Sequence, residues 1–261
     1  GVQRIKAYLM AGDVFQVNLS RRWEGHLHAG ARASDVYAAL RQANPAPFAA
    51  LWQGDGWAVV SSSPERLVGR QGERVETRPI AGTRPRHDDA LADRSAIVAL
   101  RASGKERAEH IMLIDLERND LGRVCRPGSV VVDEMMTVES YRHVHHLVSS
   151  VTGQLRPGIG PGSLLRAVFP GGTITGCPKV RCMHIIDELE SGPRGAYTGS
   201  IGYVSRCGRM DSNIAIRTLL TQGEDIHCWG GGGIVADSEW LKEYQETHDK
   251  VGKLLAALEA M

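Results

Sequence analysis

Short turns between three consecutive apolar segments constrain the fold of this chain more than any other feature. Residues 200–205, 213–220 and 225–229 each have the composition and length of a β-strand. The turns that join them contain glycine and leave no room for a helical crossover, which parallel neighbours require. The sequence therefore predicts that these segments form an antiparallel meander.

Similar patterns indicate how the rest of the chain is organised. Strand patterns occur at residues 14–19, 57–61, 66–69, 75–77, 130–132 and 147–152. Helical patterns occur at residues 2–11, at about 105–121, after Pro178, and from about Ser238 to the end of the sequence. Helices at both ends and between runs of adjacent strands are typical of an α+β fold. We expect one domain over residues 1–261, preceded in the full-length protein by a portion absent here, because a helical pattern is already under way near Gly1.

The balance of charges and the pattern of cysteines exclude several classes of protein. The 31 basic residues are matched by 30 acidic residues, so no net field recruits nucleic acid or an anionic membrane. The 5 cysteines are odd in number and show no CxxC spacing, which argues against a disulfide framework and a structural zinc site. No apolar run approaches the roughly 20 residues that span a bilayer. The sequence predicts a cytoplasmic protein that binds small molecules or specific protein surfaces.

Two pairs of glutamates occupy helical segments at the same spacing. Glu106 with Glu109, and Glu243 with Glu246, are each placed so that both carboxylates of a pair lie on one helix face. If the two helices approach each other, repulsion among the carboxylates favours a divalent cation, and oxygen ligands suit Mg²⁺. The alternative interpretation is that both pairs form ordinary solvated helix faces.

The helix from about Ser238 carries the second glutamate pair beside an apolar stripe. At about 100° per residue, Glu243, Glu246 and Lys250 lie along the border of that stripe, where they could line a cleft at the edge of the core. The stripe itself consists of Trp240, Tyr244, Val251, Leu254 and Leu258.

Several further residues could form a site for an anionic ligand. The glycine run at 230–233 follows a predicted strand, and its amides could form either an anion-binding nest or a plain turn. Arg217 interrupts an apolar strand, so it should face a paired anion or solvent. Glu65 could act as a general acid if it is semi-buried. Taken alone, however, Glu65 is typical of a turn, and the histidine pair at 145–146 is more often structural than catalytic.

Taken together, these features resemble the chorismate-binding enzymes over nearly the whole chain. The fold of that family is a pair of packed antiparallel β-sheets flanked by helices, which agrees with the α+β prediction. The order of the matching segments makes chance agreement implausible. They are GDVFQVNLS, SSSPERL, TRPIAGTRPR, KERAEHIMLIDLERNDLGRV, HHLVSS, FPGGTITGCPKVRCMHIIDELE, YTGSIGYVS, NIAIRTL, GGGGIVADS and EYQETHDK.

The resemblance implies a substrate, a metal and the residues that bind them. The substrate would be chorismate, with its ring carboxylate chelated by Mg²⁺ on Glu109 and Glu246. Glu106 and Glu243 would support the metal directly or through water. The remaining binding residues carried over from the family are Thr173, Gly231, Gly232 and Gly233 for the ring carboxylate, and Tyr197 and Arg217 for the enolpyruvyl carboxylate.

The resemblance also implies catalytic residues around the ring. Glu65 would protonate the departing 4-hydroxyl, Thr83 would position it, and His146 would lie against the ring. Lys250 would add positive charge at the metal end. Mg²⁺ would draw electron density toward the carboxylate while the acid assists loss of hydroxide.

Two positions bear on the nucleophile. Gln16 stands where the members of the family that activate water carry lysine, which favours ammonia over water. Ala81 stands where many members that aminate C4 carry a lysine nucleophile, and alanine cannot form the covalent adduct. That departure resembles the members that aminate C2 and release anthranilate, whereas FPGGTITG and GGGGIVADS resemble those that aminate C4. We favour C4 amination, which leads toward p-aminobenzoate, and retain C2 amination as the alternative.

The source of ammonia lies outside this chain. No nucleophilic cysteine with a partnered histidine and acid is evident in the sequence. Ammonia would therefore come from solution or from a separate glutamine amidotransferase subunit. A non-catalytic alternative is a regulatory subunit that binds chorismate and leaves it unchanged.

Overall fold

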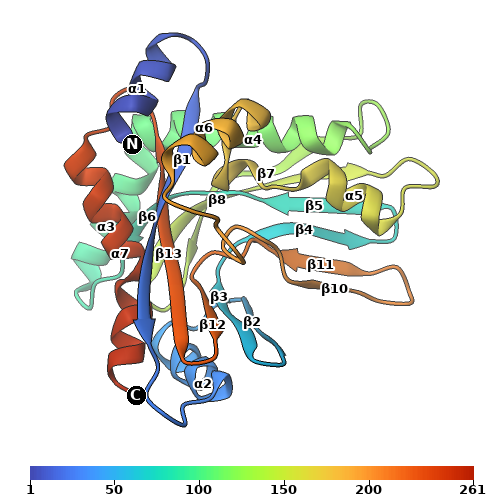
Figure 1. Ribbon diagram of the computed structural model, residues 1–261. Coiled ribbons are helices and arrows are strands. Elements are labelled where there is room, and N and C mark those ends of the chain that lie inside the picture. The colour runs from blue at the N-terminus through green and yellow to red at the C-terminus, as the bar shows by residue number, and fades with distance from the viewer. The chain divides into compact units, whose positions relative to one another are not determined.

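The computed structural model describes residues 1–261, with the exception of the side chain at position 105. The chain divides into two compact units, each assembled from segments that are distant in sequence. Unit 1 contains Gly1–Pro64, Pro170–Ile201 and Asn213–Met261, and unit 2 contains Glu65–Phe169 and Gly202–Ser212. Each unit has its own sheet and helices, which are labelled in Figure 1. The expectation of a single domain stays a prediction.

Unit 1 is built on a 6-stranded sheet. Its strand order is β2-β3-β12-β13-β1-β9, and every neighbouring pair is antiparallel. The long strands β1 and β13 pair from Val17 with Ile234 to His26 with Asp225. The strands are β1 (Gln16–His26), β2 (Phe48–Gly54), β3 (Trp57–Ser63), β9 (Gly176–Cys177), β12 (Thr218–Gln222) and β13 (Asp225–Ile234).

Helices cover one face of this sheet through two apolar clusters. In the first cluster α2 and α7 pack on β3, β12 and β13, and in the second α1 and α6 pack on β1 and β13. Both clusters use alternate residues of β13, namely Ile226, Cys228 and Ile234, so Gly230 and Gly232 face the helices as well. Trp229, Gly231 and Gly233 consequently face the opposite side. The helices are α1 (Val2–Met10), α2 (Ala33–Ala43), α6 (Lys179–Leu189), α7 (Trp240–Glu259) and the 3₁₀ turn η1 (Gly172–Ile174).

Unit 2 is built on a 7-stranded sheet of order β10-β11-β4-β5-β8-β6, in which β7 also pairs with β8. The long strand β8 pairs with β5 near its end, with β6 near its start and with β7 along its length, always antiparallel. The helices of this unit are α3 (Ala90–Ala102), α4 (Gly104–Gly122) and α5 (Pro161–Val168). The strands are β4 (Arg66–Gln71), β5 (Arg74–Arg78), β6 (Ile80–Pro85), β7 (Val131–Ser140), β8 (Val144–Gln154), β10 (Gly202–Val204) and β11 (Met210–Asn213).

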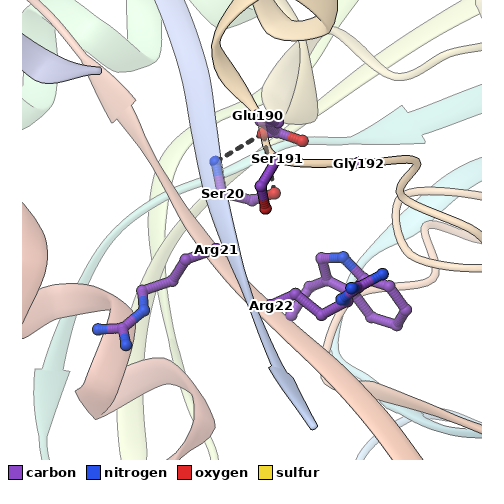
Figure 2. Close-up of a pocket in the computed structure, with 7 residues that line it drawn as sticks. Ser20, Arg21, Arg22, Glu190, Ser191 and Gly192 are labelled. Carbon is purple, nitrogen blue, oxygen red and sulfur yellow. Dashed lines mark hydrogen bonds between the residues drawn. The ribbon is translucent and has the colours of Figure 1, made fainter.

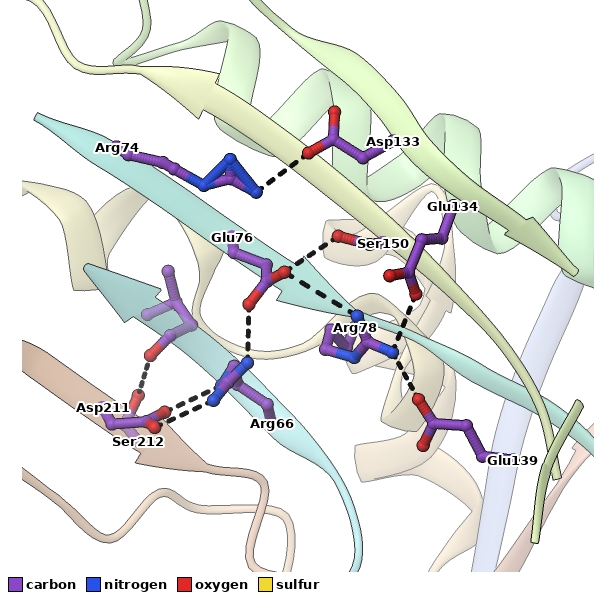
Figure 3. Close-up of polar contacts among 11 residues, drawn as sticks. Arg66, Arg74, Glu76, Arg78, Asp133, Glu134, Glu139, Ser150, Asp211 and Ser212 are labelled. Atoms are coloured by element: carbon purple, nitrogen blue, oxygen red, sulfur yellow. Dashed lines mark hydrogen bonds and ion pairs between the residues drawn. The ribbon is translucent and has the colours of Figure 1, made fainter. Parts of the chain in front are cut away.

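Ion pairs tie the strands of the unit 2 sheet together on one face (Figure 3). Arg66 on β4 makes a bidentate pair with Asp211 on β11, at 2.9 and 3.0 Å, and bonds Glu76 on β5 at 2.6 Å. The other oxygen of Glu76 accepts from Ser150 Oγ on β8 at 2.9 Å. Arg78 continues the network to two glutamates of β7. Bidentate arginine pairs are directional, so this network fixes the order and register of the strands as well as adding attraction.

Most elements predicted from the sequence are present, and the prediction of an α+β fold with antiparallel sheets and helices is confirmed. Helix α4 (Gly104–Gly122) covers the helix predicted at about 105–121, and β3, β4, β5 and β8 contain the strands predicted at 57–61, 66–69, 75–77 and 147–152. β7 begins one residue after the start of the strand predicted at 130–132, and β1 begins two residues after the start of the one predicted at 14–19. No helix in the described part of the chain is long and apolar enough to cross a lipid bilayer.

The chain after residue 200 differs from the predicted single meander. β10 and β11 form a hairpin in unit 2, whereas β12 and β13 pair in unit 1. The predicted strand at 213–220 is interrupted, because β11 ends at Asn213 and β12 begins at Thr218. Arg217 between them has a φ of 52°, which lies outside the extended region and stops the strand there.

The structure also corrects the prediction of a nest or a turn for the glycine run at 230–233. These residues continue β13 as far as Ile234 and do not form a turn. In an extended strand, successive amides point to opposite sides, so the run cannot form a nest of converging amides. The glycines matter instead because neighbouring groups approach positions 230, 231 and 233 more closely than a side chain there would allow.

The apolar stripe predicted for the last helix is wrong at its first two positions. Val251 and Leu254 are buried, but Trp240 and Tyr244 are exposed. The buried face of α7 begins with Glu243 instead. The buried carboxylate of Glu243 accepts a hydrogen bond from Ser238 Oγ at 2.6 Å.

Candidate active site

A glycine of β13 lies beneath two glutamates of α7. A Cβ placed on Gly232 would lie 3.4 Å from both Glu243 Oε2 and Glu246 Oε1. The absence of a side chain at this position therefore keeps open the space beside the two carboxylates. Unit 1 thus brings together one of the two glutamate pairs singled out by the sequence.

Two neighbouring groups stabilise the negative charge of this pair. Ser238 Oγ donates to Glu243 Oε1 at 2.6 Å, and Glu243 is only 9% exposed. Lys250 Nζ forms an ion pair with Glu246 Oε1 and donates to the carbonyl of Gly231 at 2.8 Å. Because the backbone contact fixes its ammonium group, Lys250 supplies positive charge next to the carboxylates.

The space above Gly232 fits Mg²⁺. This ion is usually bound through one or two carboxylates, keeps several waters and completes its shell with an anionic substrate. Among the described side chains, no group of three or more His, Cys, Asp or Glu residues could enclose a metal by itself. Glu243 and Glu246 could offer two carboxylates to such an ion, with Lys250 paired to Glu246 Oε1 in the structure. Glu106 and Glu109 belong to unit 2, and one Mg²⁺ bound by both pairs stays a prediction.

The opposite face of β13 carries a second group of predicted residues. A Cβ on Gly231 would lie 2.9 Å from Tyr197 Oη, and one on Gly233 would lie 2.1 Å from Gln16 Nε2. A larger residue at 233 would displace the Gln16 side chain, and one at 231 would also meet the backbone carbonyl of Leu19 at 2.9 Å. Tyr197 is buried and stacks on Trp229, with 6.0 Å between the ring centroids.

Three buried polar atoms in this part of unit 1 have no hydrogen-bond partner among the described residues. They are Gln16 Oε1, Asn18 Oδ1 and Thr173 Oγ1. Asn18 Nδ2 donates to the carbonyl of Thr173 at 3.3 Å, which places η1 beside β1. Buried polar atoms in proteins are nearly always satisfied, so such a group indicates a bound ligand or water. The sequence singled out Thr173 but not Asn18, because nothing local marks an asparagine within a strand.

A buried ion pair that the sequence did not reveal holds these residues in place. It lies beside a recess between β1 and the segment after α6 (Figure 2). Glu190 Oε1 accepts from the amide and the hydroxyl of Ser20 at 2.7 and 2.9 Å. Arg194 pairs with Glu190 and donates to the carbonyls of Asn18 and Ile174, each at 2.8 Å. The pair therefore joins η1 to β1.

Arg217 has an unusual backbone conformation in unit 1. Its φ of 52° lies in the left-handed region, and its carbonyl accepts from the amide of Ser62 at 3.0 Å. A residue other than glycine in this region costs about 1–3 kcal/mol, and such strain clusters at ligand-binding sites. The structure thus gives an independent reason to place Arg217 among the candidate binding residues.

In unit 2, β6 and β8 hold two predicted catalytic residues against each other. Thr83 is paired with His146, and Thr83 Oγ1 lies 2.9 Å from His146 Nδ1. A β-bulge at Gly82, with a φ of 79°, shifts the register just before Thr83 and so creates this pairing. The ring of Tyr141 lies beside that of His146, at 5.7 Å. Burial and a hydrogen bond to Glu139 raise the pKa of Tyr141 to about 12, so its hydroxyl remains protonated.

Helix α4 carries the other glutamate pair. Arg84 makes a bidentate pair with Glu106, at 2.6 and 3.1 Å. A Cβ on Gly82 would lie 3.3 Å from Glu106 Oε1, so a glycine leaves space beside this carboxylate too. Glu109 follows one turn later and is partly buried. Glu65, immediately before β4, is 5% exposed and so meets the condition of burial set for a general acid.

Each unit thus brings together polar residues that the sequence motifs single out, namely Glu243, Glu246 and Lys250 in unit 1 and Thr83 and His146 in unit 2. Residues 1–256 match the family described as chorismate binding enzyme. The chain therefore belongs to the chorismate-binding enzyme family, as the sequence motifs predict.

Individual relatives carry names from more than one branch of the family. The chain is 52% identical to aminodeoxychorismate synthase component 1 of Klebsiella aerogenes, over 99% of this chain and 57% of that protein. It is 50% identical to anthranilate synthase component 1 of Haloarcula marismortui, over 99% of this chain and 52% of that protein. The crystal structure of anthranilate synthase component I from Streptococcus pneumoniae superposes with a TM-score of 0.88 at 38% identity, over 97% of this chain and 56% of that one. The chain thus spans just over half the length of the relatives it matches, and their overall identity does not separate the two branches.

Proposed function

We propose that this chain catalyses the Mg²⁺-dependent amination of chorismate by ammonia to 4-amino-4-deoxychorismate. The observation that carries the proposal is the pair of carboxylates, Glu243 Oε2 and Glu246 Oε1, that both lie 3.4 Å from the position a Cβ on Gly232 would take. Two neighbouring carboxylates suit a hard cation that binds an anionic substrate. Family membership supplies chorismate as that substrate.

The proposed metal ligands are Glu109 and Glu246, with Glu106 and Glu243 in support. When bound, Mg²⁺ would act as a Lewis acid on the ring carboxylate of chorismate. Lys250, anchored on the carbonyl of Gly231, would offset negative charge at this end of the substrate.

The chain's own residues would bind the rest of the substrate. Thr173, with a buried hydroxyl that has no partner among the described residues, would bind the ring carboxylate together with the backbone of the glycines in β13. Arg217, a planar bidentate donor, and Tyr197 would bind the enolpyruvyl carboxylate. Thr173 contributes an unsatisfied hydroxyl and Arg217 a strained backbone, and a bound ligand stabilises such groups most.

Departure of the 4-hydroxyl requires a proton at that oxygen. Glu65 is the proposed donor, since it is buried and lies in unit 2 with Thr83 and His146. The contact between Thr83 Oγ1 and His146 Nδ1 restrains both side chains. Preorganised groups of this kind lower a barrier because they need not reorient during the reaction.

The nature of residue 16 supports ammonia as the nucleophile. A lysine could deprotonate water, but Gln16 has a neutral carboxamide and its buried Oε1 lacks a hydrogen-bond partner among the described residues. A carboxamide oxygen can only accept, so it can hold ammonia but cannot activate water as a base. Ala81 on β6 provides no covalent nucleophile, so we propose that ammonia adds directly. The ammonia would be supplied by a separate glutamine amidotransferase.

Anthranilate formation is the second candidate. It is favoured by Ala81, which cannot provide the lysine adduct of many C4-aminating relatives. The experiment that separates the two candidates is product chromatography after incubation with chorismate, Mg²⁺ and ammonium, with and without aminodeoxychorismate lyase. p-Aminobenzoate that appears only with the lyase supports C4 amination, whereas anthranilate without the lyase supports the second candidate. Unchanged chorismate would indicate a binding subunit without turnover.

Two matched variants of α7 test the assignment of Glu246 as a metal ligand. Glu246→Ala should abolish turnover and leave the fold intact, because Glu246 lies over Gly232 at the sheet surface and contributes little packing. Glu259→Ala, at an exposed position of the same helix, should retain full turnover. Equal activity of the two variants would refute the proposed metal site.

A further inference from the structure

Glu106 is already occupied by a cation from within the chain. Arg84 Nη1 donates to Glu106 Oε1 at 2.6 Å, and Nη2 donates to Oε2 at 3.1 Å. The carboxylate is 17% exposed and the arginine side chain 34% exposed. Both oxygens of Glu106 are therefore engaged in one partly buried bidentate pair, which is the strongest geometry available to these groups.

The pair lies where a bound metal would have to compete with it. Mg²⁺ binds a carboxylate oxygen at about 2.1 Å and demands nearly ideal octahedral geometry. A guanidinium on both oxygens of the same carboxylate blocks that approach and repels the ion, because the two cations would stand side by side with little water between them. Glu106 can thus pair with Arg84 or bind Mg²⁺ directly, but not both at once.

Arg84 has a second hydrogen-bond acceptor that it can keep when it leaves Glu106. Its Nη1 also donates to the carbonyl of Thr83 at 2.9 Å, and this contact does not depend on Glu106. Gly82 leaves the space beside Glu106 Oε1 clear of any side chain of its own. The guanidinium can therefore release the carboxylate while it keeps one hydrogen bond and gains contact with solvent.

From these contacts we infer that Arg84 is the resting counter-ion of Glu106, and that Mg²⁺ must displace it in order to use this carboxylate. Arg84 neutralises Glu106 while no metal is bound, and so sets the concentration of Mg²⁺ at which the ion can enter. The inference rests on the proposed function for the identity of the metal. It adds a residue that controls metal affinity through its contact with Glu106.

The test is isothermal titration of Mg²⁺ alone into the wild-type chain and three variants. Arg84→Gln keeps a polar side chain but removes the charge, so the dissociation constant for Mg²⁺ should fall about tenfold, equivalent to about 1.4 kcal/mol. In the background of Glu106→Gln, the same change at Arg84 should have no effect, because the carboxylate for which the two cations compete is gone. Unchanged or weaker binding in Arg84→Gln, or an equal gain in both backgrounds, overturns the inference.

A charge control separates competition at Glu106 from a general electrostatic effect. Arg107 is exposed and directly follows Glu106 on α4, so Arg107→Gln removes the same charge from the same neighbourhood. Its affinity for Mg²⁺ should stay within about twofold of wild type, since exposed charges are screened by water and salt. A tenfold gain in this variant as well would show that Arg84 has no specific role.

The outcome can be distinguished from failure of the proposed function. If the wild-type chain fails to aminate chorismate in the presence of Mg²⁺, the proposed function is wrong whatever the titrations show. If it aminates chorismate but Arg84→Gln binds Mg²⁺ as the wild type does, only the inference on Arg84 is wrong. Absence of Mg²⁺ binding in both the wild type and Arg84→Gln would likewise overturn it.

Discussion

Thr83 and His146 face each other across the β6–β8 pair, with 2.9 Å between Oγ1 and Nδ1, and a β-bulge at Gly82 sets this register. The bulge gives the strand one extra residue, which turns Thr83 toward the histidine instead of away from it. A single conformational feature of a glycine thereby orients two side chains that the sequence motifs associate with catalysis.

The contact predicts a specific effect of removing the Thr83 hydroxyl. Thr83→Val keeps the shape of the side chain but leaves His146 without this hydrogen bond, so kcat should fall about 10- to 100-fold through loss of positioning. Thr83→Ser keeps the hydroxyl and should retain most of the activity. Steady-state kinetics with chorismate would show the difference. Equal kcat values for the valine and serine variants would mean that the contact is only structural.

The space above Gly232 gives a second prediction. The added methyl of Gly232→Ala would lie 3.4 Å from oxygens of Glu243 and Glu246, an ordinary contact distance, so the protein should still fold. The methyl would occupy the space proposed for the metal, and the apparent Mg²⁺ dissociation constant should rise at least about tenfold, or about 1.4 kcal/mol. Mg²⁺ dependence of chorismate consumption measures this effect.

A matched substitution controls for the change from glycine to alanine. Gly252 lies in the same helix as Glu243 and Glu246, and a Cβ there would meet nothing within 4 Å. Gly252→Ala should therefore stabilise α7 by about 1 kcal/mol and leave Mg²⁺ dependence unchanged. If both variants responded to Mg²⁺ like the wild type, the space above Gly232 would not be the metal site.

Short-range patterns in the sequence predict much of this fold. Short runs of strand-forming residues bounded by turn residues suffice for β3, β5 and β8, and helical spacing suffices for α4. The pattern fails on α7, where Glu243 lies on the buried face while Trp240 and Tyr244 are exposed. The failure is informative, because the buried carboxylate lies over a glycine of β13, and only the tertiary structure reveals that match.

The candidate site, like the fold, is predicted from the sequence only in part. Motif resemblance singles out Glu246, Lys250, Thr83 and His146, and the structure places the members of each pair beside each other within one unit. Motif resemblance cannot reveal Arg84 as the partner of Glu106, because that pairing joins a strand to a helix 22 residues away. Such contacts depend on the path of the chain in space, and no local rule of spacing encodes them.

The buried pair of Glu190 and Arg194 gives a prediction about stability. Their side chains are 7% and 13% exposed, so removal of the arginine leaves a buried carboxylate without its counter-ion. Arg194→Met should lower the free energy of unfolding by about 3–5 kcal/mol. Arg4→Met removes a partner of the exposed pair with Glu188, whose side chains are 60% and 43% exposed, and should cost at most about 1 kcal/mol. Urea denaturation of both variants measures the difference, and similar losses would contradict a supporting role for the buried pair.

His110 predicts how stability depends on pH. It is completely buried on α4, its Nε2 lies 2.6 Å from Ser149 Oγ, and burial lowers its pKa to about 4. In the unfolded chain the pKa is near the ordinary value of 6.5, so on acidification the unfolded state takes up this proton first. A lowered pKa in the folded state means that the stabilising contribution is complete above pH 6.5 and is lost progressively as the pH falls toward 4. The loss from this residue amounts to about 3 kcal/mol at most, at 1.36 kcal/mol per pKa unit.

The contribution of His110 can be isolated by comparison with a side chain that does not titrate. His110→Gln should be less stable than the wild type at pH 7.5, because a buried ring and its contact with Ser149 are replaced, but its stability should decline less between pH 6.5 and 4. His28→Gln, at an exposed position, should reproduce the wild-type pH dependence. Urea denaturation at intervals across this range gives the slopes. Parallel curves for the wild type and His110→Gln would show that the histidine takes up its proton equally in the folded and unfolded states, and that its burial does not contribute to acid sensitivity.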